Sequence, residues 1–112
     1  MFLPSLAFAG EWIQVDGGVV EIDLRQKEFE SKLWLYLNQF RKYQFQSKDK
    51  YTYQYQVQSK DVLYINAFCK DFPNKDLNKE FLQVFDGGAC FFQIKYNLKN
   101  DKFYELIVNG EA

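Results

Sequence analysis

The stretch Phe85–Tyr96, FDGGACFFQIKY, places an acid, two glycines and a cysteine side by side. Asp86 is a candidate metal ligand or general base, Cys90 is a candidate nucleophile, and the glycines would let backbone N–H groups approach an anion. Phosphate-binding loops usually lead into a helix and often contain a lysine. Here the glycines lead into an alternating, strand-like pattern, which is typical of a tight turn that starts a strand. The same interpretation applies to Asp16-Gly17-Gly18.

The chain contains no histidine. This absence excludes Ser-His-Asp and Cys-His catalysis, the commonest metal ligand and the usual general base near pH 7. Two cysteines are too few for a four-thiolate zinc site within one chain. The carboxylate pairs Glu28/Glu30 and Asp71/Asp76 lie in charged segments that we expect to be solvated. We therefore predict no catalytic residues, no metal ligands and no cofactor. An enzyme would have to work through carboxylates or tyrosines alone.

The composition indicates a single domain of 112 residues with ample material for a core, since 47% of the residues are apolar and 20% are aromatic. Each buried aromatic ring removes roughly 150–250 Å² from water, so part of this large aromatic content is expected to face a partner. The formal net charge of −1 argues against a nucleic-acid surface and against electrostatic docking to a membrane. No run approaches the ~20 apolar residues of a spanning helix.

The N-terminal residues resemble the end of a secretory signal. Leu3–Ala9 is apolar, and Ala7-Phe8-Ala9 fits the small-x-small pattern that precedes a cleavage point, here before Gly10. No lysine or arginine precedes the apolar run. We predict that residues 1–9 are a signal-peptide remnant, that residues 10–112 form the domain, and that the protein is periplasmic or secreted. The alternative is an apolar N-terminal strand or arm that packs on the domain.

The segment Arg25–Tyr43 has the periodicity of an amphipathic helix. Its apolar face consists of Phe29, Leu33, Leu37 and Phe40. Asp23, followed three residues later by Gln26, resembles a capping box at the start of this helix.

After this helix the period changes to two. Residues 51–58, YTYQYQVQ, alternate tyrosine or valine with threonine or glutamine, which predicts a half-buried antiparallel strand. We expect its tyrosines to pack under the helix. The alternative is a stacking platform for sugars or bases, although for nucleic acid interleaved basic residues would be expected and the opposite face carries threonine and glutamine.

Four further segments have strand patterns: Asp61–Cys69, Phe81–Phe85, Cys90–Tyr96 and Phe103–Val108. Asp61–Cys69 is apolar on both faces and so predicts a central strand, while Lys70–Glu80, with Pro73-Asn74 and several charges, predicts a loop. The predicted fold class is α+β, with one N-terminal helix packed on an antiparallel sheet of about five strands, in a cystatin-like plan. That plan by itself implies no function.

Cys69 and Cys90 allow three interpretations: a disulfide, two buried free thiols, or a nucleophilic cysteine. In a plain meander Cys69 ends one strand and Cys90 begins the next but one. The two residues would then lie farther apart than the ~4.4–6.8 Å Cα separation of a bridge. A disulfide therefore requires Lys70–Glu80 to cross the sheet instead of forming a hairpin.

An apolar patch is predicted on the sheet face that points away from the helix. Tyr64 and Phe68, or alternatively Leu63 and Ile65, must face outward. Phe91 and Phe103 are expected to join them, so the candidate partner surface consists of Tyr64, Phe68, Phe91 and Phe103. Such a patch usually indicates a protein partner, a homodimer contact or a ligand groove. The N-terminal segment is the alternative cover for this face.

Three motifs resemble a group of small exported proteobacterial proteins of unknown function. They are YINAFC at Tyr64–Cys69, DGGACFF at Asp86–Phe92 and NGEA at Asn109–Ala112. Those proteins are similar in having an N-terminal signal, a strand like NAFC, a DGG-x-C-[FY]-F turn and an NG-x-A ending. The resemblance covers roughly the C-terminal half. It implies secretion and pairing of Cys69 with Cys90, and it implies no activity.

Together these observations favour a small exported α+β domain that is not an enzyme and binds a protein of the cell envelope or a secreted protein, as inhibitors and immunity proteins do. The alternative is a carrier of a small apolar or sugar ligand, held between the helix and the aromatic sheet. A pocket of about 300 Å³ or more would favour the carrier, whereas a filled core would favour the protein binder.

Overall fold

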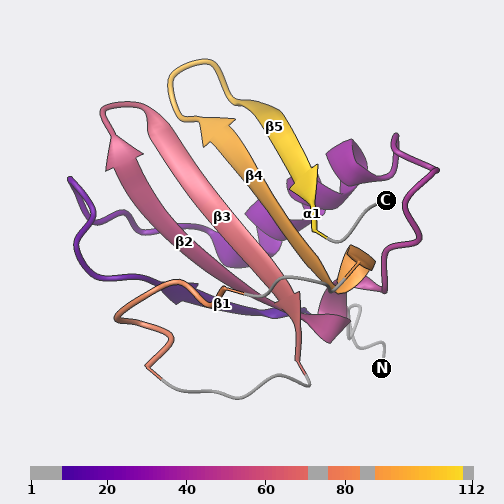
Figure 1. Ribbon diagram of the computed structural model, residues 1–112. Coiled ribbons are helices and arrows are strands. Elements are labelled where there is room, and N and C mark those ends of the chain that lie inside the picture. Colours follow the sequence, from indigo (N-terminus) through magenta and orange to yellow (C-terminus); the bar gives the residue numbers. More distant parts are fainter. Residues whose placement is uncertain (1–8, 71–75, 84–87, 110–112) are drawn as a thin grey trace, which may run out of the picture.

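The computed structural model describes residues 9–70, 76–83 and 88–109. One helix packs across a five-stranded sheet with the strand order β1-β2-β3-β4-β5 (Figure 1). The elements are β1 (Glu11–Gln14), α1 (Gln26–Leu37), the 3-10 turn η1 (Lys48–Lys50), β2 (Tyr51–Ser59), β3 (Val62–Cys69), the 3-10 turn η2 (Gly88–Cys90), β4 (Phe91–Asn97) and β5 (Lys102–Val108). The predicted α+β class is confirmed. Within the described ranges, no helix is long and apolar enough to cross a membrane.

The sheet differs from the prediction in the identity of its fifth strand. β1 runs parallel to β2, with Trp12 beside Tyr53, so the sheet is mixed and not wholly antiparallel. The strand predicted at Phe81–Phe85 is wrong where it can be checked, because residues 81–83 belong to no strand and residues 84–87 lie outside the described part. β3 pairs directly with β4, which leaves no place between them for another strand.

α1 ends at Leu37, earlier than the predicted end at Tyr43. The following turn tightens into i→i−3 hydrogen bonds, as at Phe40, whose N–H donates to Leu37 O at 3.0 Å. The chain then folds back, and the Phe45 ring packs edge-on against Trp34 at 5.6 Å. The apolar residues after Leu37 are therefore packed by a chain reversal, which helical periodicity alone does not reveal.

The predicted capping box at the start of α1 is absent. Arg25 occupies the N-cap position and makes no side-chain capping hydrogen bond, although Asp23 and Gln26 have the required spacing. The first turn is held instead by packing, because Phe29 is buried and its ring contacts Tyr96 edge-on at 4.9 Å.

The layer between α1 and the sheet is filled with side chains. Its completely buried members, each 0% exposed, are Leu33, Leu37, Tyr51, Tyr53, Val57, Leu63, Ile65, Ala67, Phe92 and Ile94. Trp12 stacks on Tyr53 with ring centres 4.3 Å apart. Trp34 Nε1 donates to the Tyr53 hydroxyl at 2.8 Å, and that hydroxyl donates to Lys48 O at 2.8 Å. The expectation that the tyrosines of β2 pack under the helix is confirmed.

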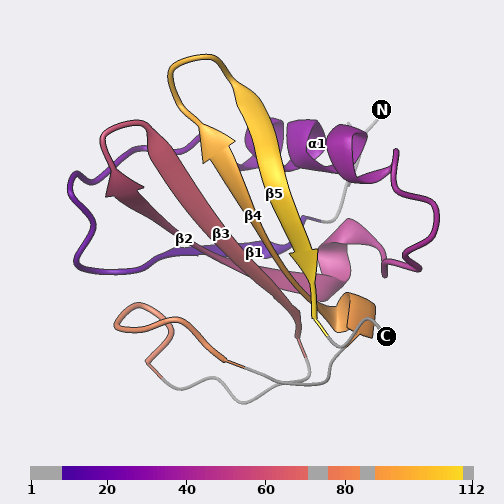
Figure 2. The same cartoon turned by 45° about the horizontal axis from the view of Figure 1, so that its top comes forward.

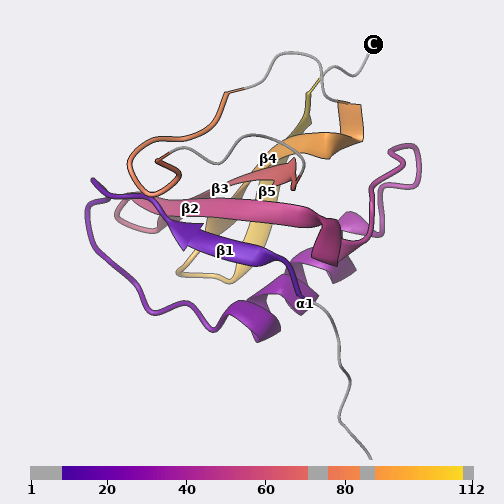
Figure 3. The same cartoon turned by 90° about the horizontal axis from the view of Figure 1, so that it is seen from below.

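The opposite face of the sheet is covered by residues 76–83, which we call the covering segment. Figures 2 and 3 show α1 and this segment on opposite sides of the sheet. Leu77 of the covering segment packs with Phe68 and Phe91, and both phenylalanines are only 1% exposed. The sheet is thus covered on both faces around Phe68 and Phe91.

Three amide side chains form a ladder across the sheet beneath the covering segment. Gln54, Asn66 and Gln93 are register neighbours on β2, β3 and β4. Asn66 Nδ2 donates to Gln54 Oε1 at 3.0 Å, and Gln93 Nε2 donates to Asn66 Oδ1 at 3.0 Å. Gln54 is 0% exposed, so the half-buried strand that the alternation predicted is in fact buried on both faces at this point.

The same amides bind the backbone of the covering segment. Gln54 Nε2 donates to Leu77 O and to Glu80 O, both at 2.8 Å. Leu82 N–H donates to Gln54 Oε1 at 2.9 Å, and Leu82 O accepts from Asn66 Nδ2 at 2.9 Å. Because buried polar groups of a segment without secondary structure need such partners, these bonds allow the covering segment to lie on the sheet.

We expect Gln54→Leu to lower the free energy of unfolding by about 2–4 kcal/mol, because Leu77 O and Leu82 N–H would lose their partner in a buried place. The measurement is urea unfolding, combined with amide hydrogen exchange at residues 77–82, which should become faster. Gln58→Leu is the matched control, since Gln58 lies on the same strand, is exposed, and its side chain bonds that of Gln56 on the same strand. Equal stability of the two variants would contradict the proposed role of the ladder.

Candidate functional site

Cys69 and Cys90 form a disulfide, with their Cα atoms 5.0 Å apart. Direct antiparallel pairing of β3 and β4 places Phe68 opposite Phe91, so the residues flanking this pair meet at one end of the sheet. The distance objection assumed a strand between β3 and β4, and it disappears because that strand is absent. Closing a loop of this length is expected to contribute about 3 kcal/mol in the chain-entropy model. A free nucleophilic thiol at either position is excluded, since both sulfurs are bonded.

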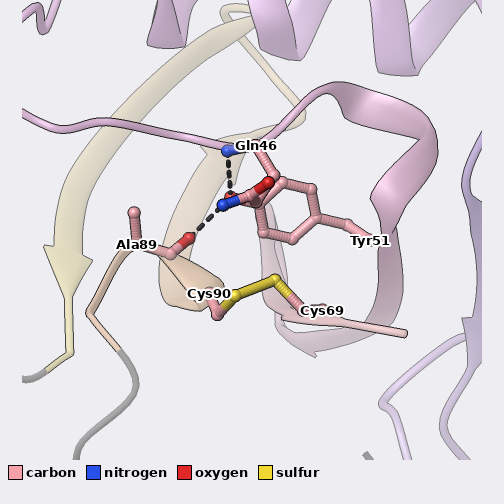
Figure 4. The surroundings of a disulfide bond; sticks show 5 residues. All are labelled: Gln46, Tyr51, Cys69, Ala89 and Cys90. Carbon is pink, nitrogen blue, oxygen red and sulfur yellow. Dashed lines mark hydrogen bonds between the residues drawn. A yellow bond between two sulfur atoms is a disulfide. The ribbon is translucent and has the colours of Figure 1, made fainter. Parts of the chain in front are cut away.

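Tyr51 lies beside the disulfide and joins two chain segments (Figure 4). Its hydroxyl donates to Ala89 O at 2.6 Å and accepts from Gln46 N–H at 3.1 Å. Ala89 immediately precedes Cys90 in η2, and Gln46 belongs to the segment that follows α1. Burial raises the pKa of Tyr51 to about 12, partly offset by the Gln46 N–H, so the hydroxyl stays protonated and available as a donor at neutral pH.

An open groove of about 760 Å³ lies where α1 ends and the chain reverses. It is lined by Ser31, Trp34, Leu35, Leu37, Asn38, Phe40, Arg41, Tyr43, Gln44, Phe45, Gln46, Ser47 and Lys48, which we call the reversal groove. Its aromatic wall is continuous with the core, because Phe45 contacts both Trp34 at 5.6 Å and Phe92 at 5.3 Å. Leu35 on its rim is 74% exposed.

The charge of the reversal groove has one sign. Arg41 and Lys48 are cationic, and the residues that line the groove in the described part of the chain include no aspartate or glutamate. The whole chain has a formal net charge of −1. Apolar surface beside unopposed cations suits a ligand that combines an apolar group with a carboxylate.

The structure does not bring the four predicted partner-surface residues together. Phe68 and Phe91 are buried beneath the covering segment, so neither a protein partner nor a second copy reaches them in this arrangement. Tyr64 is half-buried, with its ring edge-on to Phe81 at 5.0 Å, and it lines a shallow hollow of about 480 Å³. The predicted exposed patch is therefore wrong at Phe68 and Phe91, because the cover comes from residues 76–83.

Phe103 lies on the helix side of the sheet and not on the outer side. It is the register partner of Tyr96, and directly paired residues point to the same face. Its ring packs against Phe29 at 5.4 Å and Tyr36 at 5.4 Å. The predicted outward orientation of Phe103 is therefore wrong.

The glycine turns are confirmed only in part. The chain turns at Asp16 and Gly17, with Gly17 at φ 92°. Asp86 and Gly87 lie outside the described residues. Gly88 has φ 53° and begins η2, so Cys90 ends a 3-10 turn and β4 starts one residue later than predicted. Within the ranges that the structure describes, no group of three acidic or cysteine side chains is arranged to hold a metal ion.

A hydrogen-bonded chain of Lys32, Tyr96 and Asp101 links α1 to the turn between β4 and β5. Lys32 Nζ donates to the Tyr96 hydroxyl at 3.0 Å, which donates to Asp101 Oδ1 at 2.8 Å. The hydrogen bond with Tyr96 raises the pKa of Lys32, and burial raises the pKa of Tyr96. Both shifts keep Lys32 protonated and Tyr96 neutral at neutral pH, so we interpret the chain as a structural link.

Glu30 is buried, at 2% exposure, whereas Glu28 and Asp76 of the predicted solvated pairs are exposed and Asp71 lies outside the described residues. Its Oε1 accepts from Trp12 Nε1 at 2.8 Å and from Gly10 N–H at 3.0 Å. The expectation of a solvated Glu30 is wrong. A sequence signal was present, because Glu30 lies four and seven residues before the apolar residues Trp34 and Leu37, on the same helical face.

Comparison of the chain with models of protein families, with curated proteins and with solved structures finds no match. The resemblance to small exported proteobacterial proteins therefore stays a prediction. The disulfide that it implied is present.

We expect stability to fall at alkaline pH with a contribution from Tyr51. Its pKa is about 12 in the fold, whereas an unperturbed tyrosine has a pKa of about 10. As pH rises, the unfolded chain loses this proton first, so the stability contribution is complete below about pH 10 and is lost as pH rises towards 12.

Tyr51→Phe should therefore reduce the loss of stability above pH 10, while lowering stability at pH 7 by about 1–3 kcal/mol because Ala89 O and Gln46 N–H lose their partner. The measurement is urea unfolding at intervals from neutral pH to pH 11. Part of the alkaline loss should remain in the variant, since burial also raises the pKa of Tyr53. Identical alkaline slopes in the two proteins would contradict the role of Tyr51.

Proposed function

We propose that this protein is an exported domain, stabilised by a disulfide, that acts by binding and not by catalysis. Its site is the reversal groove, and its partner is an apolar protein segment that carries a carboxylate. The observation that carries this proposal is the groove itself, which joins an aromatic wall to Arg41 and Lys48 without an opposing acidic side chain among its described lining residues.

Three further observations support the proposal. The Cys69–Cys90 disulfide suits the oxidising conditions of the periplasm or the extracellular medium. The chain has no histidine, so the commonest acid–base and nucleophilic mechanisms lack their central residue. The layer between α1 and the sheet is filled by residues at 0% exposure, which favours binding at the surface over carriage of a ligand inside this layer.

A second candidate function is binding of a small amphipathic carboxylate in the same groove. Its volume of about 760 Å³ favours this candidate, because small-ligand sites typically occupy about 300–1,000 Å³. Trp34 lines the groove, so its fluorescence would report either class of ligand. A short-chain fatty acid that saturates this signal at lower concentration than any selected peptide would favour the second candidate.

The test is selection of peptides from a random displayed library on the immobilised protein. We expect the selected peptides to combine an aromatic or aliphatic residue with a nearby aspartate or glutamate, and to shift the amide NMR signals of residues 38–48. Arg41→Glu should weaken their binding about tenfold or more, because an attractive charge becomes repulsive. Leu35→Asp should also weaken it, because it places a carboxylate on the rim.

Matched controls separate the groove from general effects of charge. Lys99→Glu reverses an exposed charge in the turn after β4, and Ile107→Asp changes an apolar residue that is 58% exposed on β5. Both controls should bind the selected peptides like the wild type. Peptides that bind Arg41→Glu and Leu35→Asp as tightly as the wild type would contradict the assignment of the groove.

A further inference from the structure

Glu30 is a buried carboxylate that lacks a cationic partner among the described residues. The ion pairs formed within those residues join Arg25 to Glu28 and Lys95 to Glu105. Glu30 has only the neutral donors Trp12 Nε1 and Gly10 N–H on its Oε1. A buried charge is costly unless a counter-charge accompanies its hydrogen bonds. We therefore expect a cationic group to bind Glu30.

Gly10 is closely packed beside this carboxylate. A Cβ at this position would lie 2.5 Å from Tyr51 O, 2.5 Å from the Tyr53 ring and 2.9 Å from Lys48 O, so only glycine fits. The preceding residue, Ala9, is exposed, and the following residue, Glu11, begins β1. The backbone nitrogen of Gly10 lies 3.0 Å from Glu30 Oε1.

The sequence places a processing signal at the same bond. Ala7 and Ala9 are the small residues that a leader-removing protease requires on the N-terminal side of its cut, after an apolar run. The position of the motif and the close packing of Gly10 are independent observations, because the first comes from residue types and the second from the structure. The motif singles out the bond between Ala9 and Gly10, and the packing singles out Gly10 itself.

The geometry points to Gly10 as the N-terminal residue of the mature protein, with its α-ammonium group bound to the Glu30 carboxylate. Hydrolysis of the Ala9–Gly10 peptide bond uses one water molecule, which leaves a carboxylate on Ala9 and an amine on Gly10. The amine takes up a proton, since an α-amino group has a pKa of about 7.7–8.0 before any neighbouring carboxylate acts on it. An ion pair then replaces the neutral amide hydrogen bond, at the same two atoms.

β1 and α1 are joined at this carboxylate. Glu30 on α1, Trp12 on β1 and the backbone nitrogen of Gly10 form one hydrogen-bonded group at the edge of the sheet. Cleavage acts on the extended chain during export, before Gly10 is enclosed between Tyr51 and Tyr53. The new terminus would then fix the start of β1 once the domain folds.

The inference rests on the export part of the proposed function, and two measurements keep the two apart. The first compares the full-length chain with a chain that begins at Gly10, each as wild type, Glu30→Gln and Glu28→Gln. We expect the unfolding equilibrium constant of the wild type to fall about tenfold or more when the chain begins at Gly10. Glu30→Gln should abolish this difference. Glu28→Gln, at a side chain that is 73% exposed, should preserve it.

If Glu30→Gln does not fold, acetylation of the Gly10 amine in the wild-type protein makes the same comparison, and the acetylated form should lose the added stability. Equal stability of the two wild-type forms, a difference that persists in Glu30→Gln, or no effect of acetylation would overturn the ion pair.

The second measurement is the N-terminal residue of the protein recovered from the periplasm or medium of its producing cells, determined by mass spectrometry. Gly10 is the expected residue. An exported chain that begins elsewhere overturns this inference and leaves export intact, whereas an intact chain found only in the cytoplasm overturns export as well. Neither result bears on whether the reversal groove binds peptides.

Discussion

The direct antiparallel pairing of β3 with β4 is the constraint on which the rest of the structure depends. It sets Phe68 opposite Phe91 and brings Cys69 to Cys90, where the disulfide closes. The covering segment, residues 76–83, belongs to the chain between these cysteines and lies over the outer sheet face, where Gln54 and Asn66 bind its backbone. The outer face is thus covered around Phe68 and Phe91, where the sequence predicted a surface open to a partner. The reversal groove, of about 760 Å³, is larger than the hollow of about 480 Å³ beside Tyr64.

The bridge and the groove are physically connected through Tyr51. Its buried hydroxyl bonds Ala89 beside the disulfide and Gln46 in the groove wall, while Trp34 of the groove reaches Tyr53 on the same strand. A ligand in the reversal groove would therefore contact side chains that the disulfide end of the sheet holds in place. Such support keeps a binding surface in one arrangement before the partner arrives, which lowers the entropic cost of binding.

Residue periodicity predicted the parts of the fold that depend on local pattern, such as the helix around Leu33 and the strand with Tyr51 and Tyr53. It did not predict the features that arise between distant segments. Phe68 and Phe91 are buried because polar amides, Gln54 and Asn66, anchor a cover without secondary structure, and no periodic pattern marks such a cover. The groove depends on the chain reversal after Leu37. The helical spacing of Glu30 to Trp34 indicated a position on the buried face. The charged residues near Glu30 in the sequence favoured a solvated position instead.

The most direct test of this account is amide hydrogen exchange, followed by mass spectrometry, on the protein with the disulfide intact and after reduction and alkylation. After reduction we expect faster exchange in the covering segment and in residues 45–50, with α1 and the centres of β2 and β3 still protected. Unchanged exchange in both segments would contradict it, because the bridge would then support neither the cover nor the groove. A uniform increase along the whole chain would contradict the local role of the bridge as well.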